Sequence, residues 1–302
     1  MDQLDTMRIF SRVAELGSFT EAGSRLGLPK ASVSGAVQRL ERQLNVRLLQ
    51  RTTRRVQMTP EGQAFYERCR DLLADVDEMQ AMFQQHGAEL TGRLRVDMPT
   101  GLAKNLMPRI PEFLRAHPAL EIELSSTDRR VDLMREGFDC VIRVGALQDS
   151  SLIARPLGYF RMVNCVSPGY LAQYGEPTFD TLPQHRLVHY VPILGGRSSG
   201  FEYVDTASGE TRFMTMPGAL TVNESEAYRA ACLAGLGIIQ VPVPGVRDEL
   251  ARGTLVEVLR EHRAESMPVN LLYVNRSHLP RRVRVFMDWV GEVTQPLLTQ
   301  RP

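Results

Sequence analysis

The fold of this chain is decided by residues 16–55, which read LGSFTEAGSRLGLPKASVSGAVQRLERQLNVRLLQRTTRR. Gly17 ends a first amphipathic helix, and the run Ser18-Phe19-Thr20-Glu21 matches the capping box that opens a second helix. Leu28-Pro29 then opens a third helix, where proline is tolerated because its missing N–H would have no partner in the first turn. Three helices at such short spacing predict a small all-α domain at the N-terminal end.

The third helix has two distinct faces. Val33, Val37, Leu40 and Leu44 recur at 4-3-4 spacing, which places them toward a core. The opposite face is small and polar near its start and basic later, and it carries Ala31, Ser34, Gly35, Gln38 and Arg42, flanked by Ser32 and Arg39. Such a face suits insertion into a major groove better than packing against protein. A glycine inside a helix costs about 1 kcal/mol relative to alanine, and close approach to DNA is one reason for Gly35.

A basic hairpin follows this helix. Residues 46–51 and 54–58 form two short strand-like runs around Thr52-Thr53, and we interpret them as a wing whose arginines contact phosphates or a minor groove. The first 60 residues carry ten basic and five acidic side chains, a net charge of +5, whereas the remaining 242 residues (26 basic, 30 acidic) carry −4. A basic end on a mildly acidic body is typical of a nucleic-acid binder.

A long helix is predicted next, with Thr59 as its N-cap and Pro60 in its first turn. Apolar residues then follow a strict 4-3-4-3-4 spacing, namely Phe65, Cys69, Leu72, Val76, Met79 and Phe83. This spacing is the a/d seam of a coiled coil, which we expect to span roughly 40 Å and to join two copies of the chain. The alternative, a helix packed on its own protein, stays open.

From Gly92 the pattern changes to strands that alternate with helices, as in a parallel, doubly wound α/β unit. The chain is expected to leave this unit near residues 162–166, to build a second unit, and to return at Met267-Pro268. Two crossings between two α/β lobes predict a cleft between them. We therefore divide the chain into an N-terminal domain (1–60), a linker helix (61–88) and a two-lobed domain (92–302), with lobes 92–163 plus 267–302 and 164–266.

The bulk composition is that of a soluble globular protein. A length of 302 residues predicts two or three domains, and 43% hydrophobic with 24% charged residues is ordinary. No apolar run reaches the ~20 residues of a membrane helix, and the N-terminus, with Asp2 and Asp5, lacks the apolar region of a signal peptide. Four widely spaced cysteines without a CxxC motif favour a reduced, cytoplasmic setting.

Residues 4–62 resemble the winged helix-turn-helix of LysR-type transcriptional regulators. The resemblance is carried by Phe10, Gly17-Ser18-Phe19, Ala22, Leu26, Ser32-Val33-Ser34, Leu40-Glu41, Leu48-Leu49, Arg51-Thr52-Thr53-Arg54 and Thr59-Pro60-Glu61-Gly62. The two-lobed remainder is similar in architecture to the periplasmic-binding-protein-like effector domain of that family. One position departs from the pattern, because Gly35 stands where many members carry a longer polar residue.

The resemblance implies a homodimer joined through its linker helices, often paired again into a tetramer. It also implies binding to an interrupted promoter dyad, control by a small molecule in the cleft, contact with RNA polymerase in an activator, and no other cofactor. The physics agrees, since one helix reads only a few base pairs and a dimer supplies the remaining specificity.

Each candidate DNA contact has a specific role. Ser34 and Gln38 are the candidates for base edges, because glutamine can pair with adenine through two hydrogen bonds. The residues expected on phosphates or in the minor groove are Lys30, Ser32, Arg39, Arg51, Thr52, Arg54 and Arg55. Ser18 is first a helix cap, and a phosphate contact by Ser18 or Thr20 is secondary.

The candidate effector site begins at Pro99-Thr100-Gly101, at the carboxyl end of the first strand and just before a helix. Ligands gather at this edge of open α/β units, and a helix N-terminus favours an anion. Thr100 is the first choice by resemblance, and the further candidates are Gly101, Arg143, Asn223, Gln240 and Pro242. Arg143 could instead form a structural ion pair, and Asn223 could be only an N-cap. A small organic acid or an aromatic metabolite is the expected effector.

Three other functions compete. An enzyme is disfavoured because the chain has no Gly-x-Ser-x-Gly elbow, Walker loop or HExxH motif, and because His185 and His189 lie where a loop runs into a strand. A redox switch is disfavoured because Cys140 and Cys165 lie in apolar strand contexts, where inert burial is expected. A solute-binding protein is disfavoured by the missing signal peptide and the basic N-terminal end.

Overall fold

The structure is a computed structural model that describes residues 2–51, 56–81, 89–129, 131–147, 152–274 and 279–300. The chain divides into two compact units. The first comprises Met1–Arg93 with Ala119–Glu121, and the second comprises Leu94–Pro118 with Ile122–Pro302. Among the helices of the described residues, none is long and apolar enough to cross a membrane.

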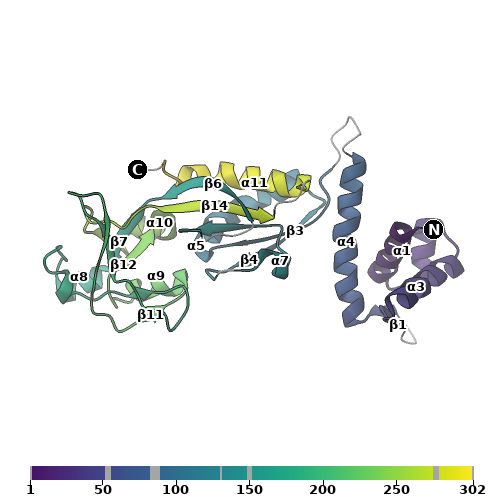
Figure 1. The fold of residues 1–302 in the computed structure, drawn as a ribbon, viewed down its shortest axis with the longest axis horizontal. Helices are drawn as coiled ribbons and strands as arrows, with labels where there is room; N and C mark the ends of the chain where they lie inside the picture. The colour runs from purple at the N-terminus through teal and green to yellow at the C-terminus, as the bar shows by residue number, and fades with distance from the viewer. Residues whose placement is uncertain are drawn as a thin grey trace. The chain divides into compact units, whose positions relative to one another are not determined.

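The first unit contains the predicted helices, the two strands of the wing and the long helix (Figure 1). Its elements are α1 (Gln3–Leu16), α2 (Phe19–Leu26), α3 (Lys30–Leu44), β1 (Leu49–Arg51), β2 (Val56–Met58) and α4 (Pro60–Ala81). The strands β1 and β2 pair antiparallel, as a wing requires. The turn between them, residues 52–55, lies outside the described residues.

Local capping fixes where these helices begin and end. The Ser18 hydroxyl accepts a hydrogen bond from the Glu21 N–H at 3.2 Å, and the Thr59 hydroxyl accepts one from the Gly62 N–H at 2.9 Å. Gly17 and Gly27 end α1 and α2 in the left-handed conformation, with φ of 59° and 66°, which glycine adopts without a steric penalty. The Ser18 and Thr59 caps predicted for α2 and α4 are therefore present. The reciprocal pair of bonds that makes a capping box is described at α1, between Asp2 and Asp5, and not at Ser18–Glu21.

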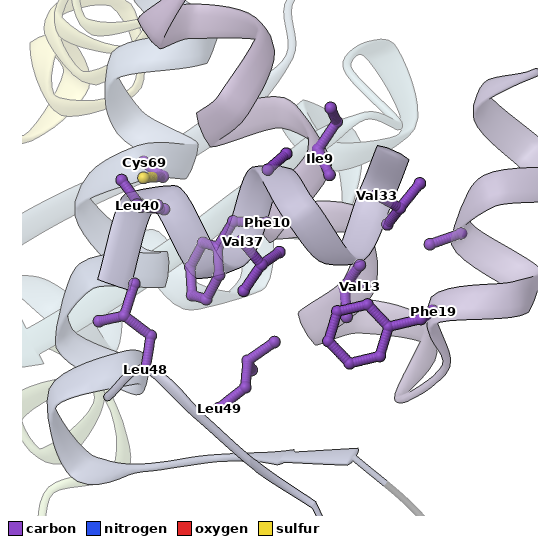
Figure 2. Packing of buried hydrophobic residues seen from close by; sticks show 12 residues of the cluster. Ile9, Phe10, Val13, Phe19, Val33, Val37, Leu40, Leu48, Leu49 and Cys69 are labelled. Atoms are coloured by element: carbon purple, nitrogen blue, oxygen red, sulfur yellow. The ribbon is translucent and has the colours of Figure 1, made fainter. Parts of the chain in front are cut away.

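The core of the first unit lies where α1, α2 and α3 meet the first turns of α4 (Figure 2). Its buried residues are Ile9, Phe10, Val13, Phe19, Ala22, Val33, Ala36, Val37, Leu40, Leu48, Leu49 and Cys69. The rings of Phe10 and Phe65 meet edge to face, with centroids 5.4 Å apart. Leu44, which the helical spacing places toward the core, is 41% exposed, because the apolar stripe of α3 ends one turn before the helix does.

The segment between α3 and β1 is held by its backbone at Leu48. The Glu41 carboxylate accepts hydrogen bonds from the N–H groups of Leu48 and Leu49, at 2.9 and 3.0 Å. On its other side, the Leu48 carbonyl accepts from the Thr59 N–H at 3.0 Å. Gly62 lies so close that a β-carbon there would be 1.9 Å from the Leu48 carbonyl oxygen. The helix α3, the wing and the long helix α4 are thus joined through contacts at one residue, Leu48.

The second unit contains a five-stranded sheet in the order β4-β3-β5-β14-β6. Its strands are β3 (Gly92–Met98), β4 (Leu120–Ser126), β5 (Cys140–Val144), β6 (Leu152–Phe160) and β14 (Met267–Val274). The associated helices are α5 (Thr100–Leu106), the 3₁₀ turn η1 (Met107–Arg109), α6 (Ile110–Ala116), α7 (Leu133–Glu136), α11 (Arg281–Thr294) and η3 (Gln295–Leu297). We call this assembly the first lobe.

The first-lobe sheet is mixed, because the parallel pairing expected of its early strands is joined by a returning strand whose direction the sequence did not indicate. β3 and β5 pair parallel, whereas β14 pairs antiparallel with both β5 and β6. The helix α11 follows β14 in the chain and is labelled with it in Figure 1. It contributes Val283, Phe286, Met287 and Val290 to the buried residues of the lobe. The returning strand therefore enters the sheet against the direction of its neighbour β5.

The second lobe is built on a three-stranded antiparallel sheet in the order β12-β7-β13. Its strands are β7 (Met162–Val166), β12 (Ile239–Pro242) and β13 (Val256–Val258), with the pairs β8 (His189–Tyr190) and β11 (Thr221–Val222), and β9 (Phe201–Val204) and β10 (Thr211–Met214). Its helices are α8 (Pro168–Tyr174), η2 (Leu182–Gln184), α9 (Ser225–Leu233) and α10 (Val243–Arg252). The chain crosses between the lobes at Arg161, two residues earlier than the boundary at 163 drawn from sequence.

The junction at Leu48 yields a stability prediction. Glu41→Ala removes the acceptor of two N–H groups on buried residues, and we expect it to lower the free energy of unfolding of the first unit by about 2 kcal/mol or more. Glu41→Gln keeps a neutral acceptor and should lose roughly half as much. Urea unfolding followed by circular dichroism measures both, with Gln43→Ala, an exposed change on the same helix, as the control. Equal losses for Glu41→Ala and Gln43→Ala would contradict the role of the Leu48 junction.

Candidate nucleic-acid interface and ligand site

The helix α3 presents the predicted reading face to solvent. Val33, Ala36, Val37 and Leu40 are buried on its other side, which fixes the rotation of the helix about its axis. The exposed candidates are Lys30, Gln38 and Arg39, and the half-buried ones are Ser32 and Ser34. This face therefore combines short hydroxyls, an amide and cations on a helix whose opposite face is firmly packed.

The candidates outside α3 divide into two groups. Ser18 serves as the cap of α2, and Thr20 is exposed in the first turn of that helix. Arg51 ends β1, but its side chain and the whole of Thr52, Arg54 and Arg55 lie outside the described residues. The position of the wing strands is thus known, while the roles of its arginines remain predictions.

The apolar seam on α4 is divided between two environments, which corrects the sequence interpretation. Phe65 packs on the core of the first unit and Cys69 is 2% exposed within it, so these two residues are used by their own chain. Leu72 and Met79 are 44% and 58% exposed, and Val76 is half-buried. Phe83 lies outside the described residues. Only the later part of the seam is available to a second copy of the chain.

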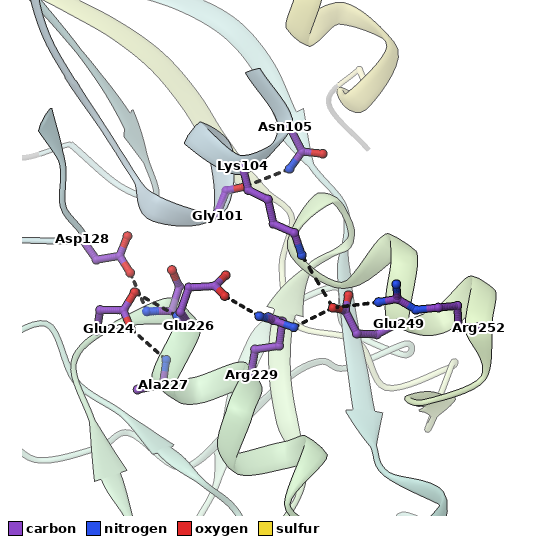
Figure 3. A network of polar contacts seen from close by, with 11 residues as sticks. Gly101, Lys104, Asn105, Asp128, Glu224, Glu226, Ala227, Arg229, Glu249 and Arg252 are labelled. Carbon is purple, nitrogen blue, oxygen red and sulfur yellow. Dashed lines mark hydrogen bonds and ion pairs between the residues drawn. The ribbon is translucent and has the colours of Figure 1, made fainter. Parts of the chain in front are cut away.

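The predicted ligand site contains a carboxylate that the sequence analysis missed. Asp128 follows β4, and its side chain accepts hydrogen bonds from two backbone N–H groups, Thr100 at 3.1 Å and Ser225 at 2.5 Å. Thr100 begins α5 in the first lobe, whereas Ser225 begins α9 in the second. Asp128 therefore joins the starts of two helices that belong to different lobes. Figure 3 shows the Asp128 side chain beside the start of α9.

Two further contacts connect the lobes beside Asp128 (Figure 3). The Asn105 amide nitrogen donates to the Gly101 carbonyl at 2.8 Å and to the Pro244 carbonyl at 3.1 Å. The Lys104 ammonium lies 3.6 Å from the buried Glu249 carboxylate. That carboxylate is also paired with Arg229 at 2.6 Å and with Arg252 at 3.5 Å. The helix α5 is thus the first-lobe side of a polar contact zone with α9 and α10.

Thr100 and Gly101 lie in this contact zone, and a β-carbon at Gly101 would meet only the Ser225 hydroxyl, at 3.9 Å. Arg143 forms an ion pair with the fully buried Asp97 at 2.6 Å, and Asp97 also accepts from the Thr127 hydroxyl. Of the two interpretations that the sequence left open for Arg143, the structural ion pair is the one present here.

The second-lobe candidates are less closely tied to the contact zone. Asn223 is exposed, and the N-cap of α9 is Glu224, whose carboxylate accepts from the N–H groups of Glu226 and Ala227. The side-chain amide of Gln240 accepts a hydrogen bond from the Glu202 N–H and donates to the Asn164 side chain and to the Glu202 carbonyl. These bonds connect β12 to other strands of the second lobe. Pro242 stands at the N-cap of α10. Asn223 is therefore not the cap, and the Gln240 amide makes all its contacts within the lobe.

A signal for Asp128 was present in the sequence. It lies just past the carboxyl end of a strand, the same rule that selected Thr100. Ser225 and Asn105 carry no such signal, because their partners are 97 and 139 residues away.

The two histidines at i,i+4 spacing make separate hydrogen bonds through Nδ1. His185 Nδ1 lies 3.1 Å from the Tyr170 hydroxyl, and burial lowers the pKa of this imidazole. His189 Nδ1 lies 3.0 Å from the Ser198 hydroxyl. Within the described residues no three His, Cys, Asp or Glu side chains are grouped as metal ligands.

All four thiols are buried. Burial raises the pKa of Cys69 and of Cys165 to about 12, and it raises the pKa of Cys140 and of Cys232 still further above the usual range of a thiol. Because the thiolate is the reactive form, these side chains are poor nucleophiles at neutral pH.

Comparison with known proteins agrees with these two units. Residues 4–63 match the family described as bacterial regulatory helix-turn-helix protein, lysR family, and residues 87–295 match the LysR substrate binding domain. The chain belongs to the LysR family of transcriptional regulators. It is accordingly a DNA-binding regulator with an effector-binding domain, and not an enzyme.

Relatives of this LysR-family chain extend over nearly its whole length. It is 50% identical over 300 residues to YhjC of Escherichia coli, an uncharacterized HTH-type transcriptional regulator, covering 99% of this chain and 100% of that protein. It is 39% identical to an HTH-type transcriptional repressor of Pseudomonas aeruginosa (97% and 92% covered) and 33% identical to the HTH-type transcriptional activator AaeR of Escherichia coli (95% and 93%).

Solved structures give the same architecture. The full-length virulence activator AphB of Vibrio cholerae matches with a TM-score of 0.57 at 32% identity, covering 96% of this chain and 98% of AphB. CrgA, a LysR-type regulator of Neisseria meningitidis, matches with a TM-score of 0.60 at 29% identity, covering 95% and 97%. A helical N-terminal domain with a two-stranded wing, followed by a two-lobed α/β regulatory domain, is thus the fold of the family.

Proposed function

We propose that this LysR-family regulator binds a promoter dyad as a homo-oligomer and changes that binding when a small organic acid or aromatic metabolite occupies the contact zone between its lobes. The proposal that the protein binds DNA through α3 depends on one observation. Polar and basic side chains of α3 are exposed on the side of the helix opposite its buried apolar residues. Contact with RNA polymerase belongs to the proposal if the protein is an activator.

The DNA contacts separate into two kinds. Gln38 and Ser34 read base edges, while Lys30, Ser32 and Arg39 hold α3 on phosphates, as side chains of these types do on a major-groove helix. Arg51, Thr52, Arg54 and Arg55 act from the wing, with Ser18 and Thr20 as secondary phosphate contacts. The net charge of +5 over the first 60 residues supports this assignment.

The two kinds of contact predict different losses. Gln38→Ala should weaken binding to the operator by about 1–3 kcal/mol while leaving binding to random duplex unchanged. Arg39→Ala should weaken both alike and reduce the slope of log K against log salt by about 1. Fluorescence anisotropy over a salt series distinguishes them, with the exposed Gln43→Ala as control.

The operator for this measurement is the fragment of the upstream intergenic region that the wild-type protein protects in footprinting. Unchanged operator binding by the double variant Gln38→Ala/Arg51→Ala would contradict the assignment of α3 and the wing as the DNA contacts.

The proposed oligomer uses the exposed part of the α4 seam. Leu72 and Met79 are large apolar side chains that stay exposed in the single chain, and Val76 lies between them at the same helical spacing. Phe83 continues this spacing beyond the described residues. A second copy of α4 is the occupant that such a narrow apolar line on a long helix favours.

Charge on this seam should dissociate the oligomer. We expect Leu72→Glu/Met79→Glu to weaken self-association by roughly a hundredfold, because two carboxylates would be buried without partners. Light scattering after size exclusion measures the mass. Gln63→Glu, an exposed change on the opposite face of α4, should leave the mass unchanged, and an unchanged mass for the double variant would remove this seam from the interface.

The proposed effector site is the contact zone around Thr100, Gly101 and Asp128. The N–H groups of Thr100 and Ser225 already bind a carboxylate in the free protein, that of Asp128. An organic acid can use the same donors when Asp128 moves, and it would then replace a contact that joins the two lobes. This exchange supplies a route from ligand binding to a change in lobe position.

The Thr100 hydroxyl gives the test of this site. An acid that raises the Tm of the wild type should bind roughly tenfold more weakly to Thr100→Val, which removes one hydrogen bond to a charged group. A thermal-shift screen of small organic and aromatic acids measures this effect. Thr91→Val, the same change at an exposed hydroxyl outside the contact zone, is the control; an acid whose shift is the same in Thr100→Val would exclude Thr100 from its site.

A redox switch gains no support from the cysteines. Each thiol is buried and holds its proton far above neutral pH, whereas a redox-sensing cysteine is exposed and has a lowered pKa.

A further inference from the structure

Gly35 stands in the middle of α3, on the face proposed to meet DNA. The helix runs without interruption from Lys30 to Leu44, and Gly35 is not among the residues with positive φ. It is half-buried, next to Ser34 and one turn before Gln38. Glycine destabilises the interior of a helix relative to alanine, so its presence at this position requires a reason.

The other glycines described in the first unit before the end of α4 have reasons within the fold. Gly17 and Gly27 have left-handed backbones at helix ends. A β-carbon at Gly23 would lie 2.6 Å from the Leu28 carbonyl oxygen, and one at Gly62 would lie 1.9 Å from the Leu48 carbonyl oxygen. Any side chain at these four positions would strain the backbone or collide with it.

Gly35 has no such reason within the described structure. Outside the backbone of its own helix, a β-carbon there would come within 4 Å only of the end of the Arg39 side chain, at 3.6 Å, which is an ordinary van der Waals distance. The fold therefore has room for alanine at this position, and alanine would stabilise the helix. The described residues of the free protein therefore give no packing reason for glycine here, and a surface that binds against this face of α3 would give one.

We propose that Gly35 is a specificity-determining residue, at which the backbone of α3 contacts the edge of a base pair in the major groove. This inference rests on the proposed DNA contacts of α3. Gly35 is adjacent to Ser34 and one turn from Gln38, the two residues proposed to read bases, and it has no side chain with which to reach a phosphate. A methyl group at this position would hold the helix away from the groove floor and weaken the hydrogen bonds of both neighbours.

The test compares Gly35→Ala with the wild type on two DNA molecules, the footprinted operator and a random duplex of the same length. We expect Gly35→Ala to raise the unfolding midpoint of the first unit, to weaken operator binding by roughly tenfold or more, and to leave random-duplex binding within about twofold. Gly245→Ala is the matched control, since it is a glycine within α10 with nothing within 4 Å of its β-carbon position. It should change neither DNA affinity.

Two outcomes would overturn the proposal. Operator binding by Gly35→Ala within twofold of the wild type would show that no close approach occurs, and equal weakening on both DNAs would place Gly35 against phosphates instead of bases. Failure of the proposed function would give a different result from failure of the Gly35 proposal alone. The wild type itself would then protect no fragment in footprinting, and the Gly35 proposal would be overturned as well.

Discussion

Leu48 is held at both sides of its backbone, by the Glu41 carboxylate at its N–H and by the Thr59 N–H at its carbonyl. Gly62 closes the arrangement, because no other residue fits at its distance from the Leu48 carbonyl. Three elements meet at this point: α3 ends at Leu44, the wing strand β1 begins at Leu49, and α4 begins directly after Thr59, whose N–H contacts Leu48. The orientation of α3 relative to the wing and the long helix is therefore set by these contacts within the first unit. The side chain of Leu48 adds to this constraint, since it is buried in the same core as α3.

The local features of the first unit could be predicted from sequence because their physical causes are local. Ser18 and Thr59 cap helices through N–H groups three residues away, and Gly17 ends a helix by its own backbone conformation. The division of the α4 seam could not be predicted. Phe65 and Met79 have the same spacing and similar hydrophobicity, yet one packs on its own core and the other stays exposed. Periodicity identifies an apolar face but does not tell which surface will cover it.

The effector domain was less predictable because its decisive contacts join distant residues. The sequence rule for strand ends found Thr100, but the partner of its N–H is Asp128 and the second donor to Asp128 is Ser225 on another lobe. Arg143 shows the opposite case, an obvious ligand candidate whose charge is used by a buried aspartate. The direction of β14 also depends on the path of the chain through the second lobe, which hydrophobic patterns do not report.

The burial of all four thiols has a practical consequence for measuring this protein. A cysteine introduced at an exposed position of α4 would be the group that a maleimide reaches first, so spin labels or fluorophores could be attached without removing the native sulfurs. In the proposed oligomer, distances between labelled copies would then report the spacing of the two α4 helices directly. A second label on α10, relative to α5, would record whether the lobes separate when a ligand enters, in the unaltered background of the natural core.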